Sequence, residues 1–398
     1  IRMLIIGYCL GIRSERRLCE EVRLNLAYRW FCRLDLTDAV PDHSTFSKNR
    51  HGRFRDSDLF RHLFESVVAR CIVEGLVGGQ TFASDASLIR ADANKQYAAA
   101  KADWDPERID VASAPRAVRE YLEVLDDAAF GAASEVDPKF TSFADPASQW
   151  TGARKGPAFF AYSDNYLIDT DHGVIVDVEA TRSIRTAEVG ATRTMIARTR
   201  DRFGLSPERL AADTAYGSGE MLGWLVGEGI EPHIPVIDKS ERHDGTFSNA
   251  EFSYDPERDE YTCPGGKTLK KYWRQMRVPR TGIGKNGFRR YYARQADCAA
   301  CALKESCYPN QPRRKIARHV HEVARDTARR IATTDAYVDA GRRRKKVEML
   351  FAHLKRLLRL DRLRLRGPNG ARDEFLLAAT AQNRRKLAKL IPGAPAPA

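Results

Sequence analysis

Hydrophobic positions recur at helical spacing along the first 75 residues of the chain. In RSERRLCEEVRLNLAYRWFCRL, Leu18, Val22 and Leu26 lie four residues apart, with charged residues between them. PDHSTFSKNR then begins another short helix, with Asp42 or Ser44 as its N-cap residue. The pattern predicts an all-helical domain over residues 1–76. Short helices that end in a polar, basic helix are typical of helix-turn-helix DNA-binding proteins, but plain helical bundles share the pattern, so DNA contact here stays open.

After a Gly-Gly turn the pattern changes to alternation, which is typical of β-strands. QTFASDASLIR alternates apolar and polar residues and predicts a strand at 80–90. PAFFAYSDNYLID and GVIVDVEATR, joined by a TDHG turn, predict a β-hairpin. The elements expected next are a helix at 186–204, a strand at 209–213, a helix at 219–229 and a strand at 231–237. This order predicts an α/β domain over residues 77–237, with an antiparallel hairpin beside parallel strands in a mixed sheet.

The remainder of the chain differs in composition. Residues 238–312 are polar, aromatic and cysteine-bearing, and predict a small insertion with short strands of its own. Residues 313–391 have a helical pattern and are expected to complete the α/β domain. The last residues, 392–398 (PGAPAPA), are expected to be a disordered tail.

Charge and hydropathy narrow the class of partner. The chain has a formal net charge of +13, and residues 342–366 hold eleven basic residues and two acids, so we expect double-stranded DNA as the partner. No apolar run approaches the roughly 18–20 residues that a membrane helix needs, and no membrane contact is expected. The start, IRMLIIGYCLGIRSERR, becomes charged too early for a secretory signal. We therefore expect a cytoplasmic protein with some residues missing before Ile1.

Two aspartates lie on the predicted sheet where a shared site can form. Asp85 lies in the first strand among apolar neighbours, and burying a carboxylate there is costly unless a metal ion compensates the charge. Asp213 ends the strand RLAAD, and ligands in open α/β sheets bind outside the carboxyl ends of strands. If the two strands are neighbours, the two carboxylates meet. Taken singly, each aspartate is more often a cap or turn residue than a metal ligand.

Glu348 is the third candidate acid. On an α-helix it shares a stripe with Arg344 and Lys355, beside an apolar stripe that would pack on the sheet. Three carboxylates on separate elements suit Mg²⁺ or Mn²⁺, and two such ions can activate a water or a 3′-hydroxyl for phosphoryl transfer. The alternative is a surface ion pair of little energetic value. The basic residues expected to hold the DNA backbone are Arg343, Arg344, Lys345, Lys346 and Lys355.

Together these segments resemble the DDE transposases of bacterial insertion sequences, in the branch with an N-terminal helical domain and a cysteine-bearing insertion. The matching segments are SDASLIRADAN around Asp85, LAADTAYGS around Asp213 and RKKVEMLFAHLKR around Glu348. The resemblance implies an RNase H-like fold, with these three acids as the metal-binding triad. It also implies cleavage at the ends of the element, transfer to target DNA, and a homodimer in the DNA complex. The family has a tyrosine where this chain has Gly341.

Four cysteines cluster within 45 residues, which needs an explanation. They are Cys263, Cys298, Cys301 and Cys307. Cys-x2-Cys is the usual half of a structural zinc site, and a reducing compartment favours a metal over disulfides. We therefore predict a structural zinc ion, with four ordinary reduced thiols as the alternative.

Three functional hypotheses follow. The first is a metal-dependent DNA strand transferase with Asp85, Asp213 and Glu348 as catalytic residues. The second is an inactive or truncated transposase-derived protein that only binds DNA. The absence of the family's tyrosine at Gly341 is compatible with this hypothesis. The third is a simple metal-dependent nuclease, which would use the same site and differ in the nucleophile of the last step.

Overall fold

The computed structural model describes residues 1–52, 54, 57–100, 103–127, 129–130, 139–152, 156–238, 244–274, 282–284 and 287–391. The chain forms two compact units. Unit 1 comprises Ile1–Ala212 and Asp335–Ala398, and unit 2 comprises Asp213–Thr334. The predicted tail at 392–398 lies outside the described residues, and the domain boundaries predicted from the sequence stay a prediction.

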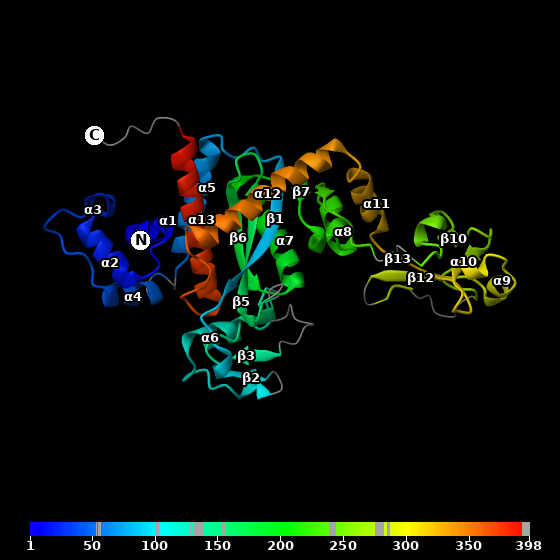
Figure 1. Cartoon of the computed structure of the whole chain (residues 1–398), viewed down its shortest axis with the longest axis horizontal. Helices are drawn as coiled ribbons and strands as arrows, with labels where there is room; N and C mark the ends of the chain where they lie inside the picture. Colours follow the sequence, from blue (N-terminus) through cyan, green and yellow to red (C-terminus); the bar gives the residue numbers. More distant parts are fainter. Residues whose placement is uncertain are drawn as a thin grey trace. The chain divides into compact units, whose positions relative to one another are not determined.

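Unit 1 begins with helices, as the pattern of the first 75 residues predicts (Figure 1). They are α1 (Arg2–Leu10), α2 (Glu15–Leu24), α3 (Leu26–Cys32), α4 (His43–His51) and α5 (Leu59–Val73). Side chains cap several of them, and Asp42 is the N-cap of α4, accepting a hydrogen bond from the backbone N–H of Ser44 at 2.9 Å. Leu4, Val22 and Phe64 are buried in one core, so the helices pack through their apolar faces.

A mixed sheet forms the centre of unit 1, which confirms the predicted mixed α/β fold class. Its strands in unit 1 are β4 (Gln149–Gly152), β5 (Ala158–Asp169), β6 (Ile175–Arg182), β1 (Thr81–Arg90) and β7 (Arg209–Ala211). β5 pairs antiparallel with β4, β6 and β1, whereas β1 and β7 run parallel. β5 and β6 are the predicted hairpin, and Gly173 in its TDHG turn has φ 69°, a conformation that glycine adopts without strain.

Helices cover both faces of the sheet. On one face lies α7 (Arg185–Phe203), where the Ser84 and Thr192 hydroxyls are hydrogen-bonded at 2.7 Å. On the other lie α12 (Asp335–Arg356) and α13 (Gly367–Leu390) (Figure 1). There the Tyr166 ring stacks on Phe351 of α12, with centroids 4.7 Å apart. Because side chains alternate along a strand, Ser84 faces α7 and Asp85 faces α12.

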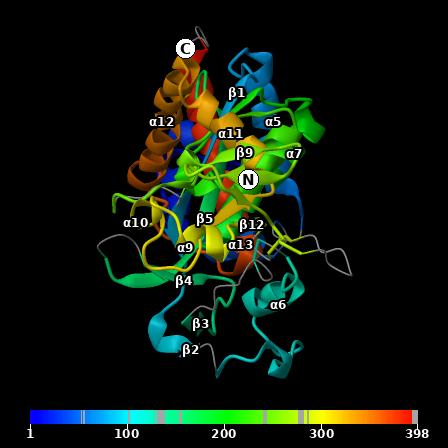
Figure 2. The ribbon, with the colours of Figure 1, turned by 90° about the vertical axis from the view of Figure 1, so that its right-hand side faces the viewer.

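A smaller layer lies between β1 and β4 in the chain (Figure 2). It contains α6 (Arg116–Glu123) and the antiparallel pair β2 (Ala98–Ala100) and β3 (Phe140–Ser142). Trp150 of β4 packs edge-on against both Phe140 and Phe160, so aromatic contacts attach this layer to the sheet.

Unit 2 contains a helical part and a part with short strands. The helical part holds α8 (Gly219–Gly227), β8 (Glu231–His233) and α11 (Glu322–Ile331). The rest holds β9 (Ser253–Asp255), β10 (Glu260–Thr262), β11 (Thr268–Leu269), β12 (Phe288–Tyr292), β13 (Lys315–His319), α9 (Gln295–Ala299) and α10 (Lys304–Cys307). Tyr261, Leu269 and Tyr291 form its small core. Short strands are thus present where the sequence predicts them; whether this segment is an insertion stays a prediction.

Candidate functional site

Asp85 and Glu348 are linked through a single arginine in unit 1. The Arg344 guanidinium lies 3.5 Å from Asp85 Oδ2 and 3.3 Å from Glu348 Oε1. The side chains of Asp85 and Arg344 are 21% and 23% exposed, whereas that of Glu348 is 57% exposed. The structure therefore places two of the three candidate acids, 263 residues apart in the chain, within reach of one cation.

Packing of α12 on the sheet fixes this geometry. Val347, Phe351 and Leu354 are buried at i, i+4 and i+7 spacing, which turns one face of the helix to the sheet. Glu348 follows Val347 and so lies at the edge of that face, one turn after Arg344. On β1, Asp85 stands opposite Tyr166, the residue whose ring stacks on α12. The apolar face of α12, which the sequence predicts, therefore explains why this helix packs on the sheet beside Asp85.

Asp213 is the first residue of unit 2 and is exposed. Ala83 and Ala211 are partners in the parallel pairing of β1 and β7, and Asp85 and Asp213 each follow two residues later. Asp213 is the N-cap of a short 3-10 helix (Thr214–Tyr216), and its Oδ1 accepts a hydrogen bond from Ala215 N–H at 2.8 Å. The capping role that the sequence left open is therefore present.

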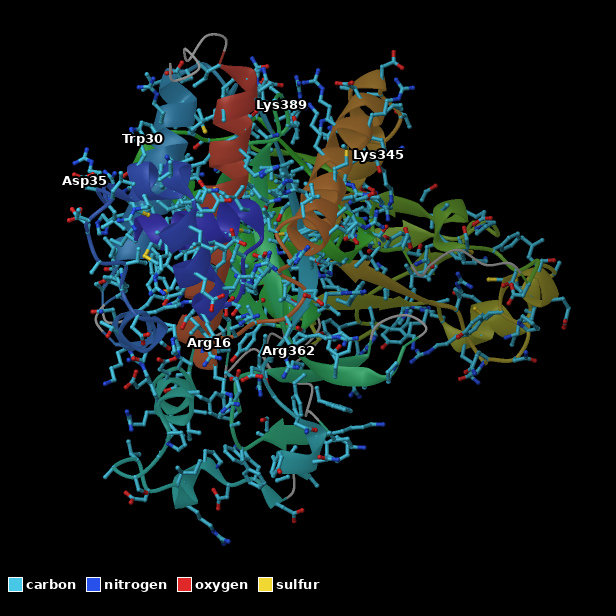
Figure 3. The ribbon with its side chains drawn as sticks, turned by 60° about the vertical axis from the view of Figure 1, so that its left-hand side comes forward. Arg16, Trp30, Asp35, Lys345, Arg362 and Lys389 are labelled. Carbon is cyan, nitrogen blue, oxygen red and sulfur yellow. The ribbon has the colours of Figure 1, made fainter. Side chains whose placement is uncertain are left out.

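The basic residues of α12 differ in what they contact. Lys346 Nζ donates to the carbonyl oxygens of Thr170 and Asp171, at 2.5 and 2.7 Å, which ties α12 to the turn after β5. Arg343 forms ion pairs with Asp171 and Asp339 at 2.8 and 2.7 Å. Lys345 is exposed on the outer side of the helix (Figure 3). Of these residues, Lys345 is therefore the one most accessible to a ligand.

Asp164 is a buried acid that the sequence analysis missed, and the partly buried Lys355 is its oppositely charged neighbour. Asp164 lies on β5 opposite Ser87 and is fully buried on the face toward α12. Burial raises the pKa of Asp164 well above its usual value, and Lys355 opposes that shift. Burial likewise lowers the pKa of Lys355, while Asp164 and Asp361 raise it. The polar stretch SDN inside the apolar strand PAFFAYSDNYLID is the signal that could have identified Asp164.

The acids of the site suit a hard divalent cation, because carboxylate oxygens are the ligands that Mg²⁺ prefers. Asp85 and Glu348 already share one positive group, the Arg344 guanidinium, so their oxygens converge on a cationic position. Within the described ranges, however, no three His, Cys, Asp or Glu side chains are grouped so that they could hold a metal ion. The structure therefore has a two-carboxylate arrangement and no preassembled triad.

The predicted structural zinc is not supported by the structure. The four cysteines, all of them free, line one small pocket of unit 2. Among the described residues, these cysteines do not form a group that could hold a metal ion. Three of them, Cys263, Cys298 and Cys307, pack against the aromatic core of this region, which agrees with the alternative of ordinary reduced thiols.

None of the helices in the described part of the chain is both long and apolar enough to cross a membrane.

Comparison with known families identifies both ends of the chain. Residues 1–52 match the Transposase domain (DUF772), which covers α1 to α4. Residues 262–388 match the Transposase DDE domain, which includes Glu348 and the whole of α12. Asp85 and Asp213 lie outside both matches. No curated protein matches the chain. Transposase domains at both ends of the chain are consistent with the DDE transposases of insertion sequences that the sequence resembles.

Proposed function

We propose that this protein is a metal-dependent DNA strand transferase. It would cut DNA at the ends of an insertion sequence and join the cut ends to target DNA. The observation that carries the proposal is the Asp85–Arg344–Glu348 arrangement, since it brings acids of β1 and α12 together on one face of the sheet. The order of antiparallel and parallel strands, with helices on both faces, supports an RNase H-like core.

Asp85, Asp213 and Glu348 are the proposed metal ligands. The parallel pairing of β1 with β7 supports the inclusion of Asp213. Ala83 and Ala211 are paired, and Asp85 and Asp213 each lie two residues after them in the chain. When bound, Mg²⁺ or Mn²⁺ supplies activation of the attacking hydroxyl and stabilisation of the leaving oxygen.

The basic residues of α12 have proposed roles in holding DNA. Arg344 neutralises Asp85 and Glu348 and can exchange these carboxylates for a phosphate, since guanidinium groups bind both in a bidentate manner. Lys345 is exposed and available for a backbone phosphate, and Arg343, Lys346 and Lys355 add positive charge along the same helix. Two element ends must be brought together for transposition, so a homodimer on DNA is part of the proposal.

The second candidate function is DNA binding without catalysis. The observation that favours it is Gly341, in place of the family's tyrosine. A Cβ at this position would meet no atom within 4 Å, so a larger side chain fits there. Gly341→Tyr is therefore a direct test. If wild type does not cleave DNA and this variant does, the result favours an inactive transposase-derived protein that only binds DNA.

The test is a cleavage and joining assay with Mg²⁺ on duplex DNA from the ends of the protein's own element. Wild type is compared with Glu348→Gln, which is isosteric and exposed enough to leave the fold intact. Cleavage and joining by wild type alone support the strand transferase. Cleavage without joining supports a simple nuclease. If wild type and Glu348→Gln both bind DNA and neither cleaves it, the result supports a DNA-binding protein without catalytic activity.

A further inference from the structure

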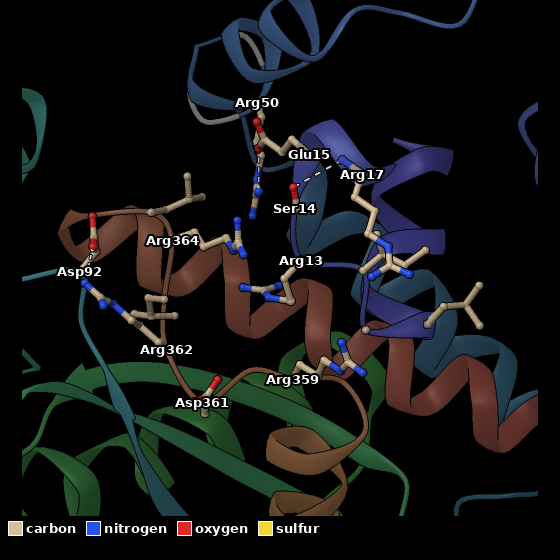
Figure 4. A pocket seen from close by; sticks show the side chains of 15 residues that line it. Arg13, Ser14, Glu15, Arg17, Arg50, Asp92, Arg359, Asp361, Arg362 and Arg364 are labelled. Atoms are coloured by element: carbon tan, nitrogen blue, oxygen red, sulfur yellow. Dashed lines mark hydrogen bonds and ion pairs between the residues drawn. The ribbon is translucent and has the colours of Figure 1, made fainter. Parts of the chain in front are cut away.

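A second basic site lies in unit 1, between the N-terminal helices and the segment that joins α12 to α13 (Figure 4). It is a cavity of about 840 Å³ lined by fifteen residues, of which six are arginines and three are acids. The arginines are Arg13, Arg17, Arg50, Arg359, Arg362 and Arg364. None of the candidate acids Asp85, Asp213 and Glu348 lines it.

Two of these arginines form a buried floor. The side chains of Arg13 and Arg50 are 8% and 4% exposed, and both pair with Glu374, which is fully buried. Arg50 also pairs with Glu15 at 2.8 Å. The Nε atoms of Arg13 and Arg50 have no hydrogen-bond acceptor among the described residues. These Nε atoms are themselves inaccessible to solvent, so it is the exposed arginines of the cavity lining that a ligand can contact.

The rim carries positive charge that protein acids do not neutralise. Leu360, Leu363 and Leu365 are buried, and this alternation turns Arg364 and its neighbouring arginines outward. Arg362 is paired with Asp92 at 2.7 Å. Within the part of the chain that the structure describes, the guanidinium groups of Arg359 and Arg364 have neither a hydrogen bond nor an ion pair. Figure 4 shows Arg13, Arg50 and Arg364 reaching into the same space.

Backbone geometry keeps the two walls of the cavity close together. Gly11, which ends α1, has φ 68°, and a Cβ there would lie 2.5 Å from the carbonyl oxygen of Leu357. Only glycine allows this approach of the α1–α2 loop to the end of α12. On the other side of the loop, Ser14 caps α2, whose N-terminal N–H groups favour an anion.

We propose that this cavity seats phosphodiester groups of duplex DNA, so that the N-terminal helices and the 359–365 segment hold one DNA backbone together. This inference rests on the proposed function. Arginines in a fork-like geometry are the preferred ligands of phosphate. The fifteen lining residues include no aromatic side chain on which a base could stack, which favours a backbone phosphate over a free nucleotide. Glu348 lies eight residues before the end of α12, roughly 12 Å along the helix, so the seated phosphates lie a few nucleotides from the proposed site.

The test is the salt dependence of DNA binding by the full-length protein, measured by fluorescence anisotropy with duplex from the element end. Each phosphate contact contributes about 0.9 to the slope of log affinity against log salt concentration. We expect the double variant Arg359→Ala/Arg364→Ala to lower the slope by about 1.8 and to weaken binding at least about tenfold near 0.1 M salt. Both residues are exposed, so their removal leaves the fold intact. Arg359→Lys/Arg364→Lys should retain most of the slope.

The matched control removes two exposed arginines elsewhere in unit 1, Arg70→Ala/Arg108→Ala, each paired with a carboxylate of its own segment. We expect its slope to equal that of wild type. If the slope of Arg359→Ala/Arg364→Ala equals that of this control, the inference is overturned. The proposed function still stands in that case if wild type cleaves DNA. Stabilisation of wild type by inorganic phosphate, with no change of slope in Arg359→Ala/Arg364→Ala, would indicate a small-anion site and would also overturn the inference. Failure of wild type to bind duplex DNA would refute both proposals.

Discussion

Two arginine–carboxylate clusters in unit 1 differ mainly in burial. In the first, Arg344 links Asp85 and Glu348, and all three side chains are at least one-fifth exposed. In the second, Arg13 and Arg50 enclose Glu374, and all three are almost completely buried. The chemistry of the groups is the same in both clusters, so burial decides what each one can do.

The buried cluster is suited to holding the fold. Burial alone would raise the pKa of Glu374, but Arg13 and Arg50 hold it below its usual value. Tyr8 OH donates to Glu374 at 3.2 Å, and Glu374 accepts the backbone N–H groups of Arg364 and Leu365 at 2.6 and 2.7 Å. None of these groups can change its partner without leaving a buried charge unpaired, which is energetically costly. The exposed cluster can exchange partners at low cost, and a site that binds a cation or phosphate requires this.

The largest expected effect concerns catalysis at the exposed cluster. Asp85→Asn and Glu348→Gln should each reduce Mg²⁺-dependent cleavage below detection, because each removes a carboxylate charge that the metal needs. DNA binding, measured by anisotropy, should stay close to wild type. Asp339→Asn is the matched control, since Asp339 is an exposed acid on the same helix that pairs with Arg343. Parallel loss of binding would mean that these acids maintain the fold instead.

The next effect concerns stability at the buried cluster. Glu374→Gln leaves Arg13 and Arg50 buried without a counter-charge, and we expect it to lower the free energy of unfolding by about 3–5 kcal/mol. Denaturant unfolding measures this. Glu21→Gln removes the acid from the exposed Arg17–Glu21 pair and should change stability by less than about 1 kcal/mol. Equal effects of the two substitutions would contradict the distinction drawn from burial.

A third prediction uses pH. The folded-state pKa of Glu374 is lowered, so its stabilising contribution is complete above its unfolded-state pKa, about 4.3, and is lost as the pH falls through the folded-state value. Asp164 has the opposite sign: its pKa is raised, so its contribution is complete below about pH 3.9 and is lost as the pH rises through the folded-state value. Asp164→Asn should therefore stabilise the protein more at pH 8 than at pH 4, measured by thermal unfolding. An equal change at both pH values would refute this account.

The smallest expected effect concerns Gly341 on α12. A Cβ there would meet no atom within 4 Å, and glycine inside a helix costs about 0.5–1 kcal/mol relative to alanine. Gly341→Ala should raise the free energy of unfolding by about that amount and leave DNA binding unchanged. A destabilised variant would show that α12 needs the flexibility of glycine at this point.

Local patterns accounted for the elements but not for all of their contacts. Alternation identified β1 and the β5–β6 hairpin, and the apolar stripe of α12 placed Glu348 at the edge of its buried face. Helical spacing also indicated the Arg344–Glu348 pair. The contact of Arg344 with Asp85 could not be derived in this way, because it depends on how α12 packs on the sheet.

Features that depend on tertiary packing were missed or not supported. The contact between Arg13 and Glu374 joins residues 361 positions apart, and no period in the sequence links them. A pair of acids, Asp373 and Glu374, directly before the apolar run FLLAA was the available signal for Glu374. For the cysteines, Cys-x2-Cys spacing does not fix where the sulfur atoms point, so the zinc prediction went further than the spacing allowed.

The central claim is that Asp85 and Glu348 bind one divalent cation together. The most direct measurement is a Mn²⁺ titration of wild type, Asp85→Asn, Glu348→Gln and the double variant, with free Mn²⁺ followed by electron paramagnetic resonance. The account predicts that each single variant loses the wild-type site and that the double variant binds no more weakly than either single variant, because both acids serve one site. Wild-type affinity in either single variant, or additive losses in the double variant, would contradict it.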